Sequence, residues 1–314
     1  MTQTVFIDGE VGTTGLQIRE RLENRSDLSF LRLPDFERKD FARRTDMLNS
    51  ADVVILCLPD AAARDAVAMI KNTNVRVIDA SSAHRVTEGW AYGMPEYETN
   101  QAEKIASASR VTNPGCYAIT SISILYPLTK AGIISQSQAI TINAISGYSG
   151  GGKKMISDFE TADGIYANTQ FRVYGLDLNH KHVPEIQKRG GLDHAPLLVP
   201  SVGNFRQGMI VQVPLQLWSL PGSPKPEDIH AALASHYAGQ RFVTVKSFAE
   251  TDKMTGLEPE SLNGTNELHL HVFRNDELGQ VVVMGLIDNL GKGASGQAVQ
   301  NLNLMISAPQ NLGL

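Results

Sequence analysis

The chain of 314 residues has few cysteines, few aromatic residues and no excess of positive charge. Its two cysteines, Cys57 and Cys116, cannot build a disulfide framework, whereas the 42% of apolar residues supply ample material for a core. The formal net charge of -5 argues against a surface for nucleic acid or an anionic membrane, because both require clustered lysine and arginine. No apolar run reaches transmembrane length, and the N-terminus carries Asp8 and Glu10 where a secretory signal needs a basic and then an apolar stretch. We therefore expect a cytoplasmic protein with a small-molecule partner, without nucleic acid or membrane.

The first third of the chain alternates between strand and helix patterns. Short apolar runs typical of buried strands occupy 4–8, 28–33, 53–58 and 75–80, and helical patterns occupy 16–21 and 61–70. This alternation predicts the parallel, doubly wound sheet of an α/β protein. Beyond a helix expected at 117–128, strand-like runs separated by glycine and proline turns predict a second domain on a mixed or antiparallel sheet. The length suits two domains.

A glycine-rich turn joins the first predicted strand to the first predicted helix. It reads Gly9-Glu-Val-Gly-Thr-Thr-Gly15, and its glycines let the backbone approach a pyrophosphate at a helix N-terminus. An ordinary turn is the alternative, but the position after the first strand favours a dinucleotide site. After the second strand, Arg32 and Pro34 stand where an acid would bind the ribose of NAD, which favours NADP. Asp35 and Arg38 lie close by, so the preference is slight.

Cys116 lies in Val111-Thr-Asn-Pro-Gly-Cys-Tyr117, between a short strand pattern and the helical run 117–128. The Asn-Pro-Gly turn places this thiol at a helix N-terminus, where backbone N–H groups and the helix dipole stabilise a thiolate. A nucleophile is the expected role, and a small buried hydrophobe is the alternative. Cys57 lies inside the apolar run 53–58, and we expect it to be structural.

His180-Lys-His-Val-Pro-Glu185 is the second informative stretch. Pro184 suits the first turn of a helix, so His182 would lie at its start with Glu185 in its first turn, able to orient the imidazole. This predicts a base with its orienting carboxylate. A structural role is one alternative, and zinc bound by His180, His182 and Glu185 is another, although no further cysteine or histidine lies near in the sequence.

Two arginines and one loop are candidate contacts for an anionic substrate. Arg85 follows the strand 75–80, and Arg206 precedes a strand expected at 209–217; a surface arginine without a ligand is the alternative for both. The segment 147–154 resembles a phosphate-binding loop but has Lys154 where the magnesium-binding hydroxyl belongs. It is predicted to be a flexible, positively charged loop, with a mobile linker as the alternative.

The C-terminal part repeats the order strand, glycine loop, helix. A strand is expected at 281–286, followed by the loop Asp288-Asn-Leu-Gly-Lys-Gly-Ala-Ser-Gly296 and a helix to about Ile306. We expect this helix to return to the first domain and its loop to border the cofactor.

These motifs, in this order, resemble the N-acetyl-gamma-glutamyl-phosphate reductase family in its shorter form, whose relatives include aspartate-semialdehyde dehydrogenase. The resemblance covers essentially the whole chain, and the Cys116 and His182 motifs are its most specific parts. It implies a Rossmann-like NADP-binding domain (1–115 plus 288–314) and a catalytic and oligomerisation α+β domain of the semialdehyde dehydrogenase type (116–287). It also implies NADP as cofactor, an acyl phosphate substrate, phosphate release, a homo-oligomer of two or four chains and no metal.

The resemblance also implies roles for single residues. Cys116 would be the nucleophile and His182 the acid and base, supported by Glu185. The cofactor contacts would be Gly9, Gly12, Thr13, Thr14, Gly15 and Asn289, and the substrate contacts Arg85, Asn113 and Arg206. The implied reaction is the reductive dephosphorylation of N-acetyl-glutamyl 5-phosphate through a thioester, in arginine biosynthesis. An enzyme like aspartate-semialdehyde dehydrogenase and a non-enzymatic NADP-binding regulator are the competing hypotheses.

Overall fold

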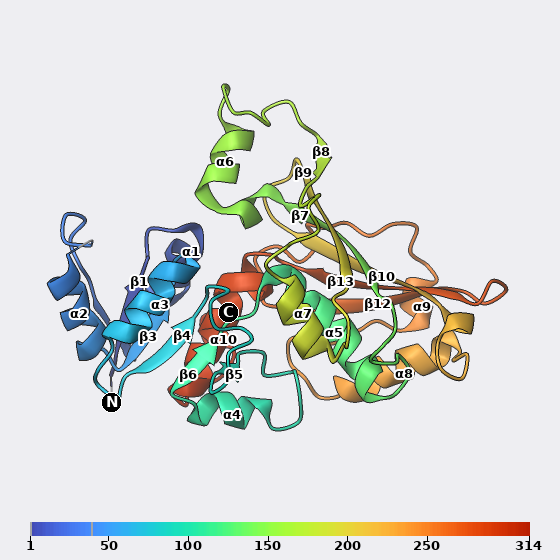
Figure 1. The fold of residues 1–314 in the computed structure, drawn as a ribbon, viewed down its shortest axis with the longest axis horizontal. Coiled ribbons are helices and arrows are strands. Elements are labelled where there is room, and N and C mark those ends of the chain that lie inside the picture. The colour runs from blue at the N-terminus through green and yellow to red at the C-terminus, as the bar shows by residue number, and fades with distance from the viewer. Residues whose placement is uncertain (1, 39) are drawn as a thin grey trace. The chain divides into compact units, whose positions relative to one another are not determined.

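The computed structural model describes residues 2–38 and 40–314, and the chain divides into two compact units (Figure 1). Residues 1–114 and 294–314 form the first unit, and residues 115–293 form the second. The assignment of a cofactor-binding role to one part and a catalytic role to the other stays a prediction.

The first unit is built on a six-stranded parallel sheet with strand order β2-β1-β3-β4-β6-β5. Its strands are β1 (Gln3–Asp8), β2 (Leu28–Leu31), β3 (Val53–Leu56), β4 (Arg76–Asp79), β5 (Ala91–Tyr92) and β6 (Arg110–Thr112). Its helices are α1 (Thr13–Leu22), α2 (Phe41–Ser50), α3 (Asp60–Met69), α4 (Gln101–Ser107) and α10 (Gly296–Met305). The strand order changes direction between β1 and β3, which makes their carboxyl ends a topological switch point. The predicted doubly wound sheet is confirmed.

Two apolar cores cover the two faces of this sheet, because successive residues of a strand point to opposite faces. Val5 and Ile55 face one core, which α1, α4 and α10 complete. Phe6 and Val54 face the other, which α2 and α3 complete. The C-terminal helix α10 therefore belongs to the first unit, as the sequence predicts.

The second unit is built on a mixed seven-stranded sheet with strand order β11-β12-β13-β10-β7-β9-β8. Its strands are β7 (Thr141–Gly147), β8 (Phe171–Val173), β9 (Leu197–Gly203), β10 (Met209–Gln216), β11 (Val243–Val245), β12 (Leu268–Asn275) and β13 (Gln280–Ile287). Its helices are α5 (Cys116–Lys130), α6 (Gly152–Glu160), α7 (Val183–Gly190), α8 (Pro226–His236) and α9 (Phe248–Thr251). The apolar helix α5 lies on β10 and β13, between α7 and α8. A mixed sheet was expected here, and the expectation is confirmed.

One predicted loop is wrong. Residues 147–154 contain the end of β7, a 3-10 turn at 148–151 and the start of α6. Lys154 lies on α6 and pairs with Asp158 one turn later, with an Nζ–Oδ2 distance of 3.0 Å. Among residues 2–38 and 40–314, no helix combines the length and the apolar character needed to cross a membrane.

Candidate active site

Cys116 is the first residue of α5. The chain leaves β6 at Thr112, and the following turn ends at Gly115, whose extended backbone (φ -81°, ψ 151°) makes it the N-cap of the helix. Cys116 is partly exposed. The N–H groups of the first turn form the positive end of the helix dipole. A helix N-terminus favours a thiolate or an oxyanion placed there, and the nucleophilic role of Cys116 stays a prediction.

The start of α7 carries the predicted base and its carboxylate. His182 is the N-cap of α7, with Pro184 and Glu185 in the first turn, as the sequence predicts. Both His182 and Glu185 are buried. The carboxylate of Glu185 accepts a hydrogen bond from the backbone N–H of Gly115, and the nitrogen lies 3.2 and 3.4 Å from the two carboxylate oxygens. Glu185 therefore joins the first turn of α7 to the N-cap of the cysteine helix. Its orientation of the His182 imidazole stays a prediction.

Two aromatic rings lie against His182, and a second tyrosine joins them through a hydrogen bond; the sequence did not point to either tyrosine. Tyr117 lies with its ring centroid 5.9 Å from that of His182, and the centroids of His180 and His182 are 4.7 Å apart. The Tyr174 hydroxyl donates to the Tyr117 hydroxyl at 3.0 Å, and Tyr117 donates to the carbonyl of Ser201 at 3.2 Å.

Both phenols stay protonated at neutral pH. Burial, together with Tyr174 and Cys116, raises the pKa of Tyr117 well above its usual value. Burial also raises the pKa of Tyr174 to about 12, and Cys116 adds to the shift although the Tyr117 hydrogen bond opposes it. Tyr117 is next to Cys116 in the sequence and offered a weak signal, whereas nothing in the sequence around Tyr174 distinguishes it.

Gly293 of the C-terminal glycine loop lies close to Cys116, and both residues belong to the second unit. Residues Gly291–Ser295 form one π turn directly before α10, instead of the open loop that the sequence suggests. A Cβ placed on Gly293 would lie 2.8 Å from the Cβ of Cys116 and 3.1 Å from Cδ1 of Ile287. Glycine is therefore required at this position for the turn to approach the cysteine.

Asn289 is hydrogen-bonded to two other segments of the second unit. Its Oδ1 accepts from the N–H of Gly208 at 2.7 Å, and its Nδ2 donates to the Ser149 hydroxyl at 3.1 Å. The preceding Asp288 accepts from the N–H of Gly264 at 2.8 Å and from Nε2 of Gln207 at 2.5 Å. This pair fixes the chain before the π turn. The predicted position of Asn289 beside a nicotinamide is not tested by these contacts.

The glycine turn of the first unit fits a dinucleotide phosphate. Gly9 has a left-handed backbone (φ +89°), and a Cβ there would meet the carbonyl of Cys57. Gly12 is the N-cap of α1, so Thr13, Thr14 and Gly15 form its first turn. The Thr13 hydroxyl is buried and has no hydrogen-bond partner among the described residues. An anion at this helix start would satisfy that hydroxyl and the unpaired N–H groups of the first turn.

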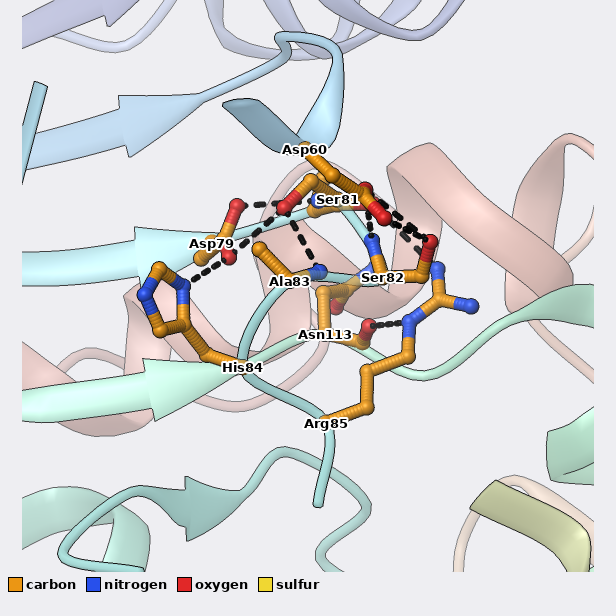
Figure 2. A network of polar contacts seen from close by, with 9 residues as sticks. Asp60, Asp79, Ser81, Ser82, Ala83, His84, Arg85 and Asn113 are labelled. Carbon is orange, nitrogen blue, oxygen red and sulfur yellow. Dashed lines mark hydrogen bonds and ion pairs between the residues drawn. The ribbon is translucent and has the colours of Figure 1, made fainter. Parts of the chain in front are cut away.

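Arg85 and Asn113 lie together in the first unit (Figure 2). Arg85 is buried, which makes the alternative of a surface arginine wrong, and its Nε donates to the carbonyl of Asn113 at 3.1 Å. The side chain of Asn113 donates from Nδ2 to the carbonyl of Ala294 at 2.9 Å, and its Oδ1 accepts from Asn301 at 3.0 Å. Asn113 therefore ties the turn before Cys116 to the C-terminal segment.

A polar network fixes the segment that presents Arg85. Figure 2 shows Asp79, at the end of β4, bonded to both Ser81 and His84. The Oδ2 of Asp79 lies 2.6 Å from Nδ1 of His84. The ring of Trp90 stacks on the imidazole ring of His84, with 4.2 Å between the ring centroids. Ser82 donates through its N–H and its hydroxyl to Asp60 at the start of α3. The backbone before Arg85 is therefore held at both serines.

Arg206 is placed differently from Arg85. It is an exposed residue of the second unit and forms an ion pair with Glu160 at the end of α6. No group of three or more histidine, cysteine, aspartate and glutamate side chains suited to a metal ion occurs within residues 2–38 and 40–314.

Two family models match the chain. The model described as "Semialdehyde dehydrogenase, NAD binding domain" matches residues 34–105, and the model described as "Semialdehyde dehydrogenase, dimerisation domain" matches residues 116–289. Among solved structures, aspartate semialdehyde dehydrogenase II from Vibrio cholerae superposes with a TM-score of 0.71 at 16% identity, covering 98% of this chain and 99% of that chain. Aspartate semialdehyde dehydrogenase with NADP from Candida albicans gives a TM-score of 0.65 at 13% identity, covering 99% of both chains. These similarities concern the fold.

Curated relatives are much closer in sequence. N-acetyl-gamma-glutamyl-phosphate reductase from Burkholderia cenocepacia is 53% identical over 305 residues, which cover 97% of each chain. N-acetyl-gamma-glutamyl-phosphate reductase 2 from Pseudomonas putida is 52% identical over 312 residues, which cover 99% of each chain. The chain therefore belongs to the N-acetyl-gamma-glutamyl-phosphate reductase family, a branch of the semialdehyde dehydrogenases.

Proposed function

We propose that the chain catalyses the NADPH-dependent reductive dephosphorylation of N-acetyl-glutamyl 5-phosphate to N-acetylglutamate 5-semialdehyde, a step of arginine biosynthesis. The observation that carries the proposal is the thiol of Cys116 on the first turn of α5, beside the start of α7 with His182 and Glu185. The names of relatives at 52–54% identity support this acyl phosphate as the substrate.

In the proposed mechanism, His182 accepts the thiol proton and the sulfur of Cys116 attacks the acyl carbon. A carbon–sulfur bond forms as the bond from carbon to the phosphate oxygen breaks, which leaves a thioester on Cys116 and releases phosphate. The N–H groups at the start of α5 stabilise the oxyanion of this step. NADPH held at the glycine turn would supply the hydride for the thioester carbonyl. His182 gives its proton to the carbonyl oxygen and takes it back as the carbon–sulfur bond breaks, which frees the aldehyde and the thiolate.

The neutral phenols and the glycine turns position these groups. Tyr117 and Tyr174 remain hydrogen-bond donors at neutral pH, and the Tyr117 ring packs against His182. Gly9, Gly12, Thr13, Thr14 and Gly15 would hold the dinucleotide, and Asn289 would keep the loop before the π turn in place. A cytoplasmic location fits this pathway role.

We further propose Arg85 as the arginine that contacts an anionic group of the substrate. Its guanidinium is buried at the carboxyl end of the sheet, on a segment that the network of Asp79 holds in place. Arg206 already has Glu160 as its partner. Arg206→Ala should therefore raise the KM for the acyl phosphate much less than Arg85→Ala does.

The match to a dimerisation domain over residues 116–289 supports a homo-oligomer. We propose a dimer as its smallest form, which light scattering of the purified chain measures directly.

The test of the function is the reverse reaction with NADP, phosphate and N-acetylglutamate semialdehyde, run beside aspartate semialdehyde. Turnover of the acetylated substrate alone supports the proposal. A preference for aspartate semialdehyde would instead support the enzyme class of the structural neighbours, and NADP binding without turnover of either aldehyde would support a regulatory protein.

A further inference from the structure

A cavity of about 630 Å³ opens in the first unit beside the glycine turn. Gly9, Glu10 and Val11 of the turn line one part of it. Leu33, from the segment after β2, lines another part, and Phe36 adds an aromatic ring that is 84% exposed. The cavity is therefore continuous with the turn that fits a dinucleotide phosphate.

The position and lining of this cavity suit an adenosine. A pyrophosphate at the glycine turn places the attached ribose and base along the carboxyl ends of β1 and β2. Apolar side chains, including Leu33 and Leu58, offer a surface for the base, and an exposed phenylalanine ring can stack on it. A ring as exposed as that of Phe36 has no role in the apolar core.

Arg44 reaches the cavity from α2 and is held in place by Asp8. Its Nη2 lies 2.7 Å from Oδ2 of Asp8, the last residue of β1, and both side chains are mostly buried. Asp8 therefore neutralises Arg44 through one nitrogen only. A guanidinium has five N–H donors in a rigid fork, so the bonded arginine retains donors for a second anion.

Arg38 lines the same cavity from the segment after β2. It pairs with Asp35 at 2.9 Å, but Asp35 is 88% exposed, whereas Arg38 is 31% exposed. An ion pair with so exposed a carboxylate contributes little to stability, so Arg38 can exchange it for a stronger partner. A phosphate monoester carries close to two negative charges at neutral pH and is such a partner.

The acidic residues around the cavity do not oppose a phosphate, because each is either paired with another arginine or open to solvent. Asp8 pairs with Arg44, and Glu10 pairs with Arg19 at 3.8 Å. Asp35 is 88% exposed, so solvent screens its charge once a phosphate takes its place on Arg38. An NAD site would instead present a carboxylate to the ribose hydroxyls.

We propose that Arg38 and Arg44 together bind the 2'-phosphate of NADP, and that Phe36 stacks on the adenine. The inference rests on the proposed function only in taking a nicotinamide dinucleotide as the ligand. It assigns the preference for NADP over NAD, which the sequence leaves almost balanced, to two arginines that approach one cavity from separate segments.

The test measures nucleotide binding by titration calorimetry on the full chain without any substrate. The probes are 2',5'-ADP and 5'-AMP, which differ only in the 2'-phosphate. The wild-type chain should bind 2',5'-ADP at least about tenfold more tightly, since hydrogen bonds to charged groups carry this much free energy. Arg38→Ala and Arg44→Ala should each remove most of this difference and leave the affinity for 5'-AMP almost unchanged. Phe36→Leu should weaken both nucleotides alike.

Arg43→Ala is the matched control. Arg43 is the neighbour of Arg44 on α2, pairs with Glu37 and does not line the cavity, so this variant should bind both probes as the wild type does. Because Arg44→Ala leaves Asp8 without its partner, the double variant with Asp8→Asn keeps the charge balanced and should show the same loss for 2',5'-ADP.

Equal binding of the two probes by the wild-type chain would overturn the proposal, as would arginine variants that retain the difference. Cys116→Ser should bind both probes normally. A chain that binds 2',5'-ADP as expected but reduces no acyl phosphate would refute the proposed function and leave this inference standing.

Discussion

Cys57 and Cys116 each follow a strand of the same parallel sheet, yet the chain gives their thiols opposite surroundings. Cys57 continues from β3 in an extended segment, and burial, with the negative charges of Asp79 and Asp8, raises its pKa to about 12. Cys116 follows the Pro-Gly turn after β6 and begins α5, facing the positive end of a helix dipole. The comparison teaches that the electrostatics of its position, and not the residue type, makes a thiol a candidate nucleophile.

The largest effect should come from Cys116→Ser. Loss of a covalent nucleophile typically lowers kcat by about 10⁴-fold or more, because the remaining groups only bind and orient the substrate. Steady-state assays of the reverse reaction measure this loss, and Cys57→Ala should retain turnover. Comparable losses in the two variants would break the distinction between the cysteines.

Selective alkylation sharpens the comparison without any substitution. At about pH 8, a thiol with a pKa near 12 is only about one part in 10⁴ thiolate, because it lies four pH units below its midpoint. Iodoacetamide should therefore modify Cys116 long before Cys57, and Cys57 should begin to react only as the pH rises toward 12. Peptide mass spectrometry gives both rates, and similar labelling of both cysteines would contradict the assignment.

His182→Asn should lower the rate by about 10²-fold or more, the usual contribution of a general acid and base. The variant should also lose the limb of the pH–rate profile that reports the imidazole. His194→Asn, at an exposed histidine, is the matched control and should leave both rate and profile intact. An unchanged pH–rate profile in His182→Asn would show that another residue acts as the base.

Glu185→Gln should have the smallest effect, about tenfold on kcat, since the amide oxygen still accepts from Gly115 while the charge near His182 is lost. Glu185→Ala leaves the buried N–H of Gly115 unpaired and should lower the free energy of unfolding by about 1–3 kcal/mol. Chemical denaturation of the two variants separates the roles. If Glu185→Ala were as stable as the wild type, the hydrogen bond from Gly115 to Glu185 would not stabilise the contact between α5 and α7.

Local patterns predicted much of the fold and of the candidate site. A few consecutive residues determine each of three features: the turn at Gly9, the helix start at Cys116 and the helix start at Pro184. This is because caps and tight turns depend on neighbours in the chain. The cores of the first sheet follow from apolar runs in the same way.

Contacts between distant segments escaped prediction. The Tyr174 hydroxyl meets Tyr117 57 residues away, and Glu185 meets Gly115 70 residues away. Arg85 carries no local sign that the fold buries it. The segment 147–154 was predicted as a loop because of its glycines, but helix α6 begins at Gly152 and includes both lysines. Such features depend on tertiary packing, which overrides local propensity.

The most direct test of the central claim is to mix the chain with N-acetyl-glutamyl 5-phosphate in the absence of NADPH and to analyse its peptides by mass spectrometry. The account predicts phosphate release in one burst and an N-acetylglutamyl group on Cys116, absent from Cys57 and from the Cys116→Ser chain. An acyl group on another residue, or no acyl-enzyme under conditions where the complete system turns over, would contradict it.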